Sequence, residues 1–338
     1  MIKKESKLSE KIFQKDIEVV ATRQGYGEGL VVAGEKDEKV VVLSADLKES
    51  TRSILFEERF PERYIEVGVA EQALATIAAG MATYGKIPFI SSYAAFSPGR
   101  NWEQIRTTIA LNDVPVKIGG AHAGLTVGQD GATHQMLEDI SIMRAMPNMI
   151  VLAPCDAVEA KKATLEAAKN GKPTYIRFAR EKTPVFTTED SPFKIGRAEI
   201  FWDPSIGSGH GADPMVAIIA CGPLVYEALL AARDLEKKGI ESLVINCHTI
   251  KPLDEQTIIR AAKTAGAVVT VEENQITGGL GGAVSELLSK NFPTPMEFIG
   301  MPDSFGESGQ PNELLEKYEM KAKDIVEAAK RAISRKIT

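Results

Sequence analysis

The sequence predicts an α/β protein of two consecutive three-layer domains, each built on a mostly parallel sheet covered by helices. Short apolar runs rich in β-branched residues alternate with helical patterns along almost the whole chain, as in βαβ units. A length of 338 residues is typical of two domains of ordinary size. The polar stretch DPSIGSGHGADP interrupts the alternation and predicts a long loop or hairpin at a domain edge. We expect domains at residues 10–190 and 191–338.

The first domain contains the expected strands KVVVLSA, YIEVGV, IPFISSY, VPVKIGG, MIVLAP and PTYIRF. A helix of small apolar residues, which suit close packing on a sheet, is expected at Glu71 within the stretch EVGVAEQALATIAAGMA. Another helix follows Asp156, a residue that favours the N-terminal cap, and ends at an Asn-Gly pair.

The second domain repeats the pattern. Strands are expected at MVAIIACG, ESLVINCHTI, AVVTVEEN and PMEFIGM, with helices at residues 223–238, 254–265 and 281–290. The chain ends in an amphipathic helix whose basic end suits the helix dipole. The run TGGLGGAVSELL lacks the GxGxxG spacing of a dinucleotide-binding loop, so its glycines predict close packing of a helix on the sheet.

Composition excludes several classes of function. A net charge of −6 disfavours sequence-independent binding to nucleic acid, which needs a basic surface. The apolar runs are shorter than the roughly twenty residues needed to cross a bilayer, and the N-terminus lacks the apolar core of a secretory signal. Three isolated cysteines are typical of reduced core residues. These features predict a cytoplasmic protein that binds neither nucleic acid nor membranes.

Polar residues follow several of the expected strands, where parallel sheets bind their ligands. Asp46 follows one strand, four residues before Ser50, and could instead be a helix cap or turn residue. Glu71 lies among small apolar residues. It is either a water-exposed residue at a helix start, stabilised by the dipole, or a carboxyl group kept in an apolar pocket. Tyr93 and Phe96 lie at the mouth of a loop, although aromatic rings usually belong to the core.

The most unusual segment is the loop GGAHAGLTVGQDGATHQM. It combines five glycines with His122, Asp130 and His134, and a glycine-rich loop of this length inside a compact domain is usually functional. The spacing of twelve between the two histidines matches no compact metal-binding motif, so we expect no metal ligands in this chain. Anion binding or proton transfer by histidine fits better. A serine hydrolase is excluded because no GxSxG sequence is present.

Together these motifs resemble one family. GVAEQ, the aromatic loop ending in WEQIR, GQDGATHQ and PNMIVLAPCDAVEA resemble the pyrimidine-binding domain of transketolase-type thiamine diphosphate enzymes. VVTVEEN, GGLGG and HTIKPLD resemble the transketolase C-terminal domain. The resemblance extends from about Arg23 to the last helix.

The resemblance implies a role for each candidate residue. Glu71 would contact N1′ of the aminopyrimidine and promote removal of the thiazolium C2 proton, which requires a carboxyl group shielded from water. Glu71 and His134 are therefore the expected catalytic residues. Expected cofactor contacts, besides Glu71, are Phe96, Tyr93 and Asp46. Expected phosphate contacts to a sugar-phosphate substrate are Arg23, Ser50, His122 and Arg180. Asp130 and His134 would contact the ketose hydroxyls.

The family's second cofactor domain has no counterpart in the sequence. That domain holds Mg²⁺ and diphosphate through a GDG motif followed by Asn, and no GDG occurs. The resemblance thus implies the C-terminal subunit of a split transketolase, paired with an N-terminal subunit in an α2β2 assembly. The alternatives are a deoxyxylulose-phosphate synthase-like protein, a β subunit of a 2-oxo acid dehydrogenase, and a non-catalytic binding subunit that retains the fold.

Overall fold

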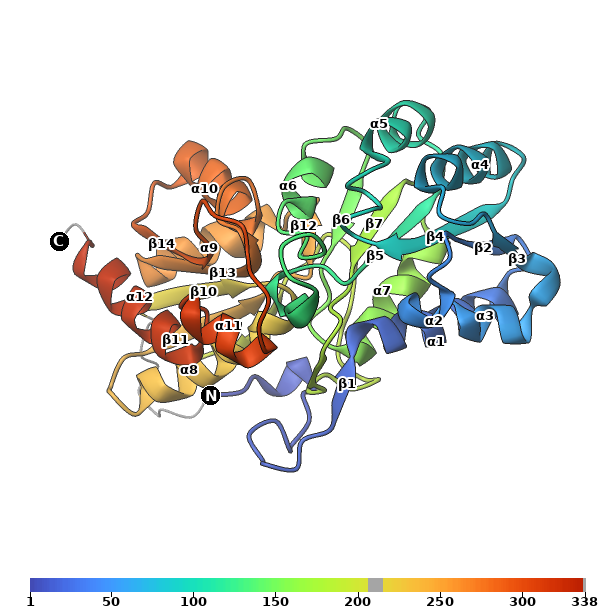
Figure 1. Ribbon diagram of the computed structural model, residues 1–338. Helices are drawn as coiled ribbons and strands as arrows, with labels where there is room; N and C mark the ends of the chain where they lie inside the picture. Colours follow the sequence, from blue (N-terminus) through green and yellow to red (C-terminus); the bar gives the residue numbers. More distant parts are fainter. Residues whose placement is uncertain (206–214, 337–338) are drawn as a thin grey trace.

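The computed structural model describes residues 1–205 and 215–336. Two sheets, each with helices on both sides, lie next to each other (Figure 1). The larger sheet belongs to the first half of the chain and the smaller one to the second half. The expected α/β class with mostly parallel sheets is confirmed. Part of the expected loop DPSIGSGHGADP, residues 206–214, lies outside the described residues.

The larger sheet has seven strands in the order β12-β6-β7-β5-β4-β2-β3. Its parallel members are β2 (Val40–Ser44), β3 (Tyr64–Glu66), β4 (Ile87–Tyr93), β5 (Lys117–Ala121), β6 (Ile150–Leu152) and β7 (Thr174–Arg177). Alternate residues of β2 enter different cores: Val41 and Leu43 face one, and Val40 and Val42 face the other. Burial on both faces explains why β2 is an almost continuous apolar run.

Helices cover both faces of this sheet (Figure 1). They are α1 (Thr22–Lys36), α2 (Lys48–Thr51), α3 (Ile54–Arg59), α4 (Glu71–Thr83), α5 (Trp102–Gln104), α6 (Asp139–Arg144) and α7 (Ala157–Lys169), with a π-helical turn at Ile105–Ala110. The side chain of Asp156 accepts a hydrogen bond from Glu159 N at 2.9 Å, which confirms the expected cap of α7. A Cβ on Gly25 of α1 would lie 1.8 Å from Ala157 O, so that glycine permits the close approach of α1 to α7.

The smaller sheet has five strands in the order β14-β13-β10-β11-β9. They are β9 (Glu199–Trp202), β10 (Val216–Ala220), β11 (Ser242–Asn246), β13 (Val268–Gln275) and β14 (Met296–Met301), all parallel except the edge strand β9. The helices of this half are α8 (Val225–Glu236), α9 (Glu255–Ala265), α10 (Leu280–Asn291), α11 (Pro311–Lys317) and α12 (Ala322–Ser334). A Cβ on Gly281 of α10 would lie 2.7 Å from the Phe298 ring. The expected close packing of this helix is confirmed.

One strand of the second half joins the larger sheet. The run ESLVINCHTI, expected as one strand, forms β11 and then β12 (Thr249–Lys251), which pairs antiparallel with β6 of the larger sheet. The expectation of a single strand was wrong because the pairing of β12 depends on a contact with the other half. β1 (Val19–Ala21) and β8 (Lys182–Pro184) form a separate two-stranded antiparallel sheet.

A buried polar cluster joins the halves. The guanidinium of Arg177 donates from Nε to Asp139 Oδ2 at 2.8 Å and from Nη2 to Glu273 O at 2.7 Å. The Tyr175 hydroxyl donates to the same Asp139 oxygen at 2.6 Å. Within the described ranges, no helix is long and apolar enough to cross a membrane.

Candidate active site

The candidate residues gather where the connectivity of the larger sheet reverses. The chain passes from β2 to the neighbouring β3 and then returns to β4 on the other side of β2. In open α/β sheets, ligands bind outside the carboxyl ends of the strands at such a switch point. Asp46 follows the end of β2, and Tyr93 is the last residue of β4. The loops after these strands and after β5 form the site.

Glu71 is the first residue of α4 and is almost completely buried, with 2% of its surface exposed. Its Oε2 has no hydrogen-bond partner within the described part of the chain. The nearest cation is Arg100, whose Nη1 lies 3.5 Å from Oε2 and whose side chain is 58% exposed. Asn101 Nδ2 donates to the main-chain oxygen of Glu71 at 2.8 Å and thereby ties α4 to the aromatic loop. A buried carboxyl oxygen with a free acceptor position is suited to a donor that a ligand supplies.

The local backbone explains how Glu71 comes to begin a helix there. Gly68 adopts φ +70°, the left-handed region that glycine enters without strain. Glu66 Oε1 accepts hydrogen bonds from Gly68 N and Asp46 N, both at 2.8 Å. This carboxylate therefore fixes the loops after β2 and β3 against each other just before α4 starts.

Four rings lie together beside this helix start. Tyr93 stacks on His122 with a centroid distance of 3.9 Å and on Phe96 at 5.9 Å. His134 meets Phe96 edge-on at 5.5 Å and Tyr93 at 6.2 Å. Phe96 is linked to Glu71 through the loop, because Arg100 N donates to Phe96 O. The structure thus brings the aromatic loop and both histidines together.

Arginines surround His122. Arg23 Nη1 lies 3.5 Å from His122 Nε2 and donates to Ser50 O at 2.7 Å. Burial, followed by the positive charges of Arg23 and Arg180, lowers the pKa of His122 to about 3. The imidazole is therefore neutral at physiological pH. Since the guanidinium can only donate, Nε2 is the acceptor and Nδ1 carries the proton, with no partner among the described residues.

Arg180 lies near this group but is held by the glycine-rich loop, since its Nη1 donates to Val127 O at 2.6 Å. Asp130 ends the turn Leu125–Asp130 and is exposed. His134 is half-buried, and its Nδ1 lies 2.8 Å from Thr133 Oγ1. Asp46 is also exposed, and its main-chain contact is with Glu66.

The glycines of this loop have a packing role that the sequence did not predict. A Cβ on Gly124 would lie 2.5 Å from Glu273 Oε1, and one on Gly131 would lie 2.4 Å from Ser308 Oγ. Gln135 Nε2 donates to Leu125 O and Glu307 O. The second half of the chain therefore holds the loop that carries Asp130 and His134.

Sequence reasoning missed Arg100, Glu66 and Asn101. Arg100 lies in the aromatic loop, in the run YAAFSPGR, but nothing in the pattern indicates that it reaches α4. Glu66 lies inside the expected strand YIEVGV, and the two main-chain donors at its carboxylate can be identified only once the loops are placed.

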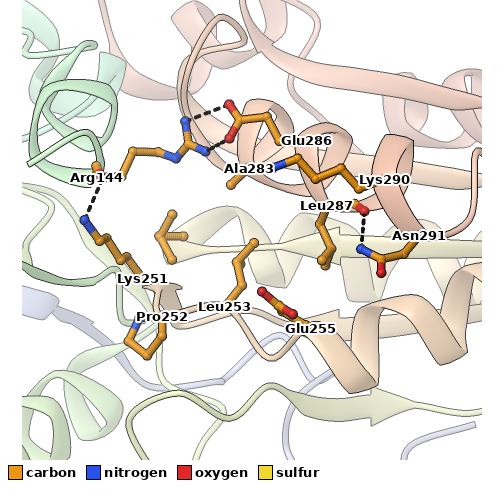
Figure 2. Close-up of a pocket in the computed structure, with 11 residues that line it drawn as sticks. Arg144, Lys251, Pro252, Leu253, Glu255, Ala283, Glu286, Leu287, Lys290 and Asn291 are labelled. Carbon is orange, nitrogen blue, oxygen red and sulfur yellow. Dashed lines mark hydrogen bonds and ion pairs between the residues drawn. The ribbon is translucent and has the colours of Figure 1, made fainter. Parts of the chain in front are cut away.

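A separate cavity of about 560 Å³ lies between the two halves and contains none of the candidate residues (Figure 2). Arg144, Lys251 and Glu286 are already partnered, whereas Glu255 and Lys290 also line the cavity. Arg144 forms a two-pronged ion pair with Glu286, and Lys251 Nζ donates to Arg144 O and Met146 O. The group around Glu71 holds the residues singled out from the sequence, and we take it as the candidate functional site.

The fold and this site define a protein made of a pyrimidine-binding domain followed by a transketolase-type C-terminal domain. Residues 18–185 match the family model "Transketolase, pyrimidine binding domain", and residues 210–325 match "Transketolase, C-terminal domain". The chain belongs to the transketolase family, of which it matches the pyrimidine-binding and C-terminal domains.

The similar proteins agree with this assignment. A putative transketolase C-terminal section from Methanocaldococcus jannaschii is 45% identical over 316 residues, covering 91% of this chain and 96% of that protein. The 6-deoxy-6-sulfo-D-fructose transketolase subunit SqwH of Clostridium sp. is 38% identical over 96% of this chain and 98% of its own length. A solved structure described as a split gene transketolase, inactive beta4 tetramer, superimposes with a TM-score of 0.86 at 41% identity, covering 94% of this chain and all of that one.

Proposed function

We propose that this chain is the C-terminal subunit of a thiamine diphosphate-dependent transketolase. It transfers a two-carbon ketol unit from a ketose phosphate to an aldose phosphate. The observation that carries the proposal is the buried Glu71 carboxyl group, whose Oε2 has no hydrogen-bond partner in the described chain and lies beside an aromatic loop. Membership of the family supports the reaction type.

The residues around Glu71 fit the aminopyrimidine end of the cofactor. Thiamine diphosphate, when bound, supplies the carbon nucleophile that carries the ketol unit. Glu71 Oε2 would share a proton with N1′ of the ring, and its burial keeps water from competing for that proton. Phe96 would stack on the ring with Tyr93 at its border, and Asp46 would lie at the edge of the same pocket. Arg100 must move aside, which its exposed side chain permits.

The arginine group fits the phosphate of a sugar. Arg23 and Arg180 supply charge-assisted donors, and Ser50 is adjacent to Arg23. The neutral His122 offers its Nδ1 proton as a further donor. Asp130 and His134, on the loop held by the second half, would contact the ketose hydroxyls, with His134 positioned to move a proton near the cleaved bond.

The proposal requires a partner subunit. Mg²⁺ and the diphosphate would bind mainly to an N-terminal subunit, giving an α2β2 assembly with the cofactor at the interface. A solved structure whose whole chain matches 94% of this one is described as an inactive beta4 tetramer, which supports dependence on a second subunit.

Reconstitution tests the proposal. Ketol transfer is measured with xylulose 5-phosphate as donor, using the purified chain with thiamine diphosphate and Mg²⁺, alone and with an N-terminal subunit. Turnover only in the mixture is expected. Robust turnover by the chain alone refutes the requirement for an N-terminal subunit. If the mixture turns over no ketose phosphate, the result supports the non-catalytic alternative. Turnover with pyruvate as donor, and none with a ketose phosphate, favours a deoxyxylulose-phosphate synthase-like protein or a 2-oxo acid dehydrogenase β subunit over a transketolase.

A further inference from the structure

Glu66, the last residue of β3, gathers three hydrogen-bond donors at the edge of the candidate active site. Its side chain is exposed, yet its Oε1 accepts main-chain hydrogen bonds from Asp46 N and Gly68 N, both at 2.8 Å. The Tyr64 hydroxyl donates to the other carboxyl oxygen, Oε2, at 3.2 Å. An ionised carboxylate has acceptors only and makes charge-assisted hydrogen bonds, so it matches this set of donors.

The two main-chain donors belong to turns with an unusual backbone. Asp46 has φ +58° and Gly68 has φ +70°, so both residues lie in the left-handed region. Glycine adopts this conformation without strain, whereas for a residue with a side chain it is sparsely populated and must be held by its surroundings. The hydrogen bond from Asp46 N to Glu66 stabilises this conformation at the end of β2.

The same oxygen joins the turn at Asp46 to the turn that leads to Glu71. Ala70 N donates to Gly68 O at 2.7 Å, and α4 begins at the next residue, which is Glu71. The main chain between Gly68 and α4 is therefore short and tightly turned. A shift of Gly68 would move the start of α4 relative to Asp46, and Glu66 restrains that shift.

We propose that Glu66 is a positioning residue for cofactor binding. It holds Asp46 and the start of α4 at the separation that the aminopyrimidine end of thiamine diphosphate requires. The inference rests on the proposed function, in which Asp46 and Glu71 lie in one pocket. Glu66 acts through these two residues and needs no contact with the cofactor. Its loss should weaken cofactor binding and leave the reaction of the bound cofactor largely intact.

Hydrogen exchange in the purified chain tests the positioning without cofactor or turnover. NMR should show exchange at least tenfold faster at the amides of Asp46 and Gly68 in Glu66→Ala than in the parent. Glu66→Gln keeps an acceptor oxygen and should restore slow exchange. Glu62→Ala changes a side chain that is 69% exposed shortly before β3. It is the matched control and should leave both amides unchanged.

Cofactor binding tests the consequence. The reconstituted assembly of both subunits is titrated calorimetrically with thiamine diphosphate at a fixed Mg²⁺ concentration. Glu66→Ala should raise the dissociation constant at least tenfold, and Glu66→Gln should stay within threefold of the parent. The kcat at saturating cofactor and the KM for xylulose 5-phosphate should change less than threefold in Glu66→Ala. A general loss of structure would not give this split.

Two results would overturn the inference: unchanged exchange at both amides in Glu66→Ala, or cofactor binding by this variant as tight as that of the parent. In the second case the parent still binds thiamine diphosphate, so the proposed function survives. If the parent assembly binds none, both fail. If Glu66→Ala does not fold, Glu66→Asp decides the matter, because it keeps the charge but withdraws the carboxylate by one carbon–carbon bond. It should show the same two losses, and parental behaviour would count against the inference.

Discussion

Arg23 Nη1 lies 3.5 Å from Nε2 of His122. This contact determines which nitrogen of the ring carries the proton, because a guanidinium has donors only. It also places a fixed positive charge beside a ring that is already buried. The two effects act in the same direction: His122 is neutral and presents Nδ1–H as a donor.

The low pKa of His122 should make the protein less stable in acid. Burial and the neighbouring arginines lower its folded-state pKa to about 3, whereas in the unfolded chain it is about 6.5. Between these values the unfolded state binds more protons, so stability should fall as pH falls from 6.5 toward 3, by up to about 1.4 kcal/mol per pH unit. Urea unfolding at pH 7 and pH 5 should show a smaller loss for His122→Asn than for the parent. An identical loss would contradict the assignment.

Glu71→Gln should lower kcat of the reconstituted enzyme by at least about 100-fold, because an amide cannot take over the proton shared with the cofactor. The melting temperature should not fall, since Oε2 makes no hydrogen bond in the described chain. Gln72→Ala, at the neighbouring exposed position, is the matched control and should retain activity. Activity of Glu71→Gln within a few-fold of the parent would eliminate the proposed proton role.

Local patterns were sufficient to predict most of the fold. The run IPFISSY is β4 along its whole length, and the helix expected at Glu71 begins at that residue. Both follow from neighbouring residues: an apolar run long enough for a buried strand, and small side chains in helical succession. The short strand β12 could not be predicted in the same way, because its partner β6 lies about a hundred residues earlier in the chain.

The site was predictable to the level of its loops. The rule that parallel strands bind ligands at their carboxyl ends correctly brought Tyr93 and His122 together. The contact of Arg100 with Glu71 depends on the path of the aromatic loop, which no pattern specifies. The close approach of Gly124 to Glu273 could not be predicted from the sequence either, because it joins the two halves of the chain.

Two ion pairs, a buried one within the first half and an exposed one between the halves, should differ widely in their contributions. Asp139 is fully buried and is bound by Arg177 and Tyr175, so Asp139→Ala leaves a buried cation unpaired and should cost about 3–5 kcal/mol. Glu286 is 60% exposed, although it binds Arg144 at 2.6 Å, and Glu286→Ala should cost less than about 1 kcal/mol. Urea unfolding of both variants measures the difference. Equal losses would show that burial does not decide the strength of these pairs.

Two adjacent glycines of α10 offer the sharpest test of the packing. A Cβ on Gly281 would lie 2.7 Å from Phe298 Cδ1 and 2.9 Å from Thr270 Oγ1. Gly281→Ala must therefore displace either the Phe298 ring or the helix and should destabilise the protein by about 1–3 kcal/mol. A Cβ on Gly282 would meet nothing closer than 3.9 Å, so Gly282→Ala should stabilise by up to about 1 kcal/mol through helix propensity. Thermal or urea unfolding of the pair should give opposite signs, because the two positions share one helix and differ only in the face they present. If Gly281→Ala were neutral, α10 would lie farther from β14 than described.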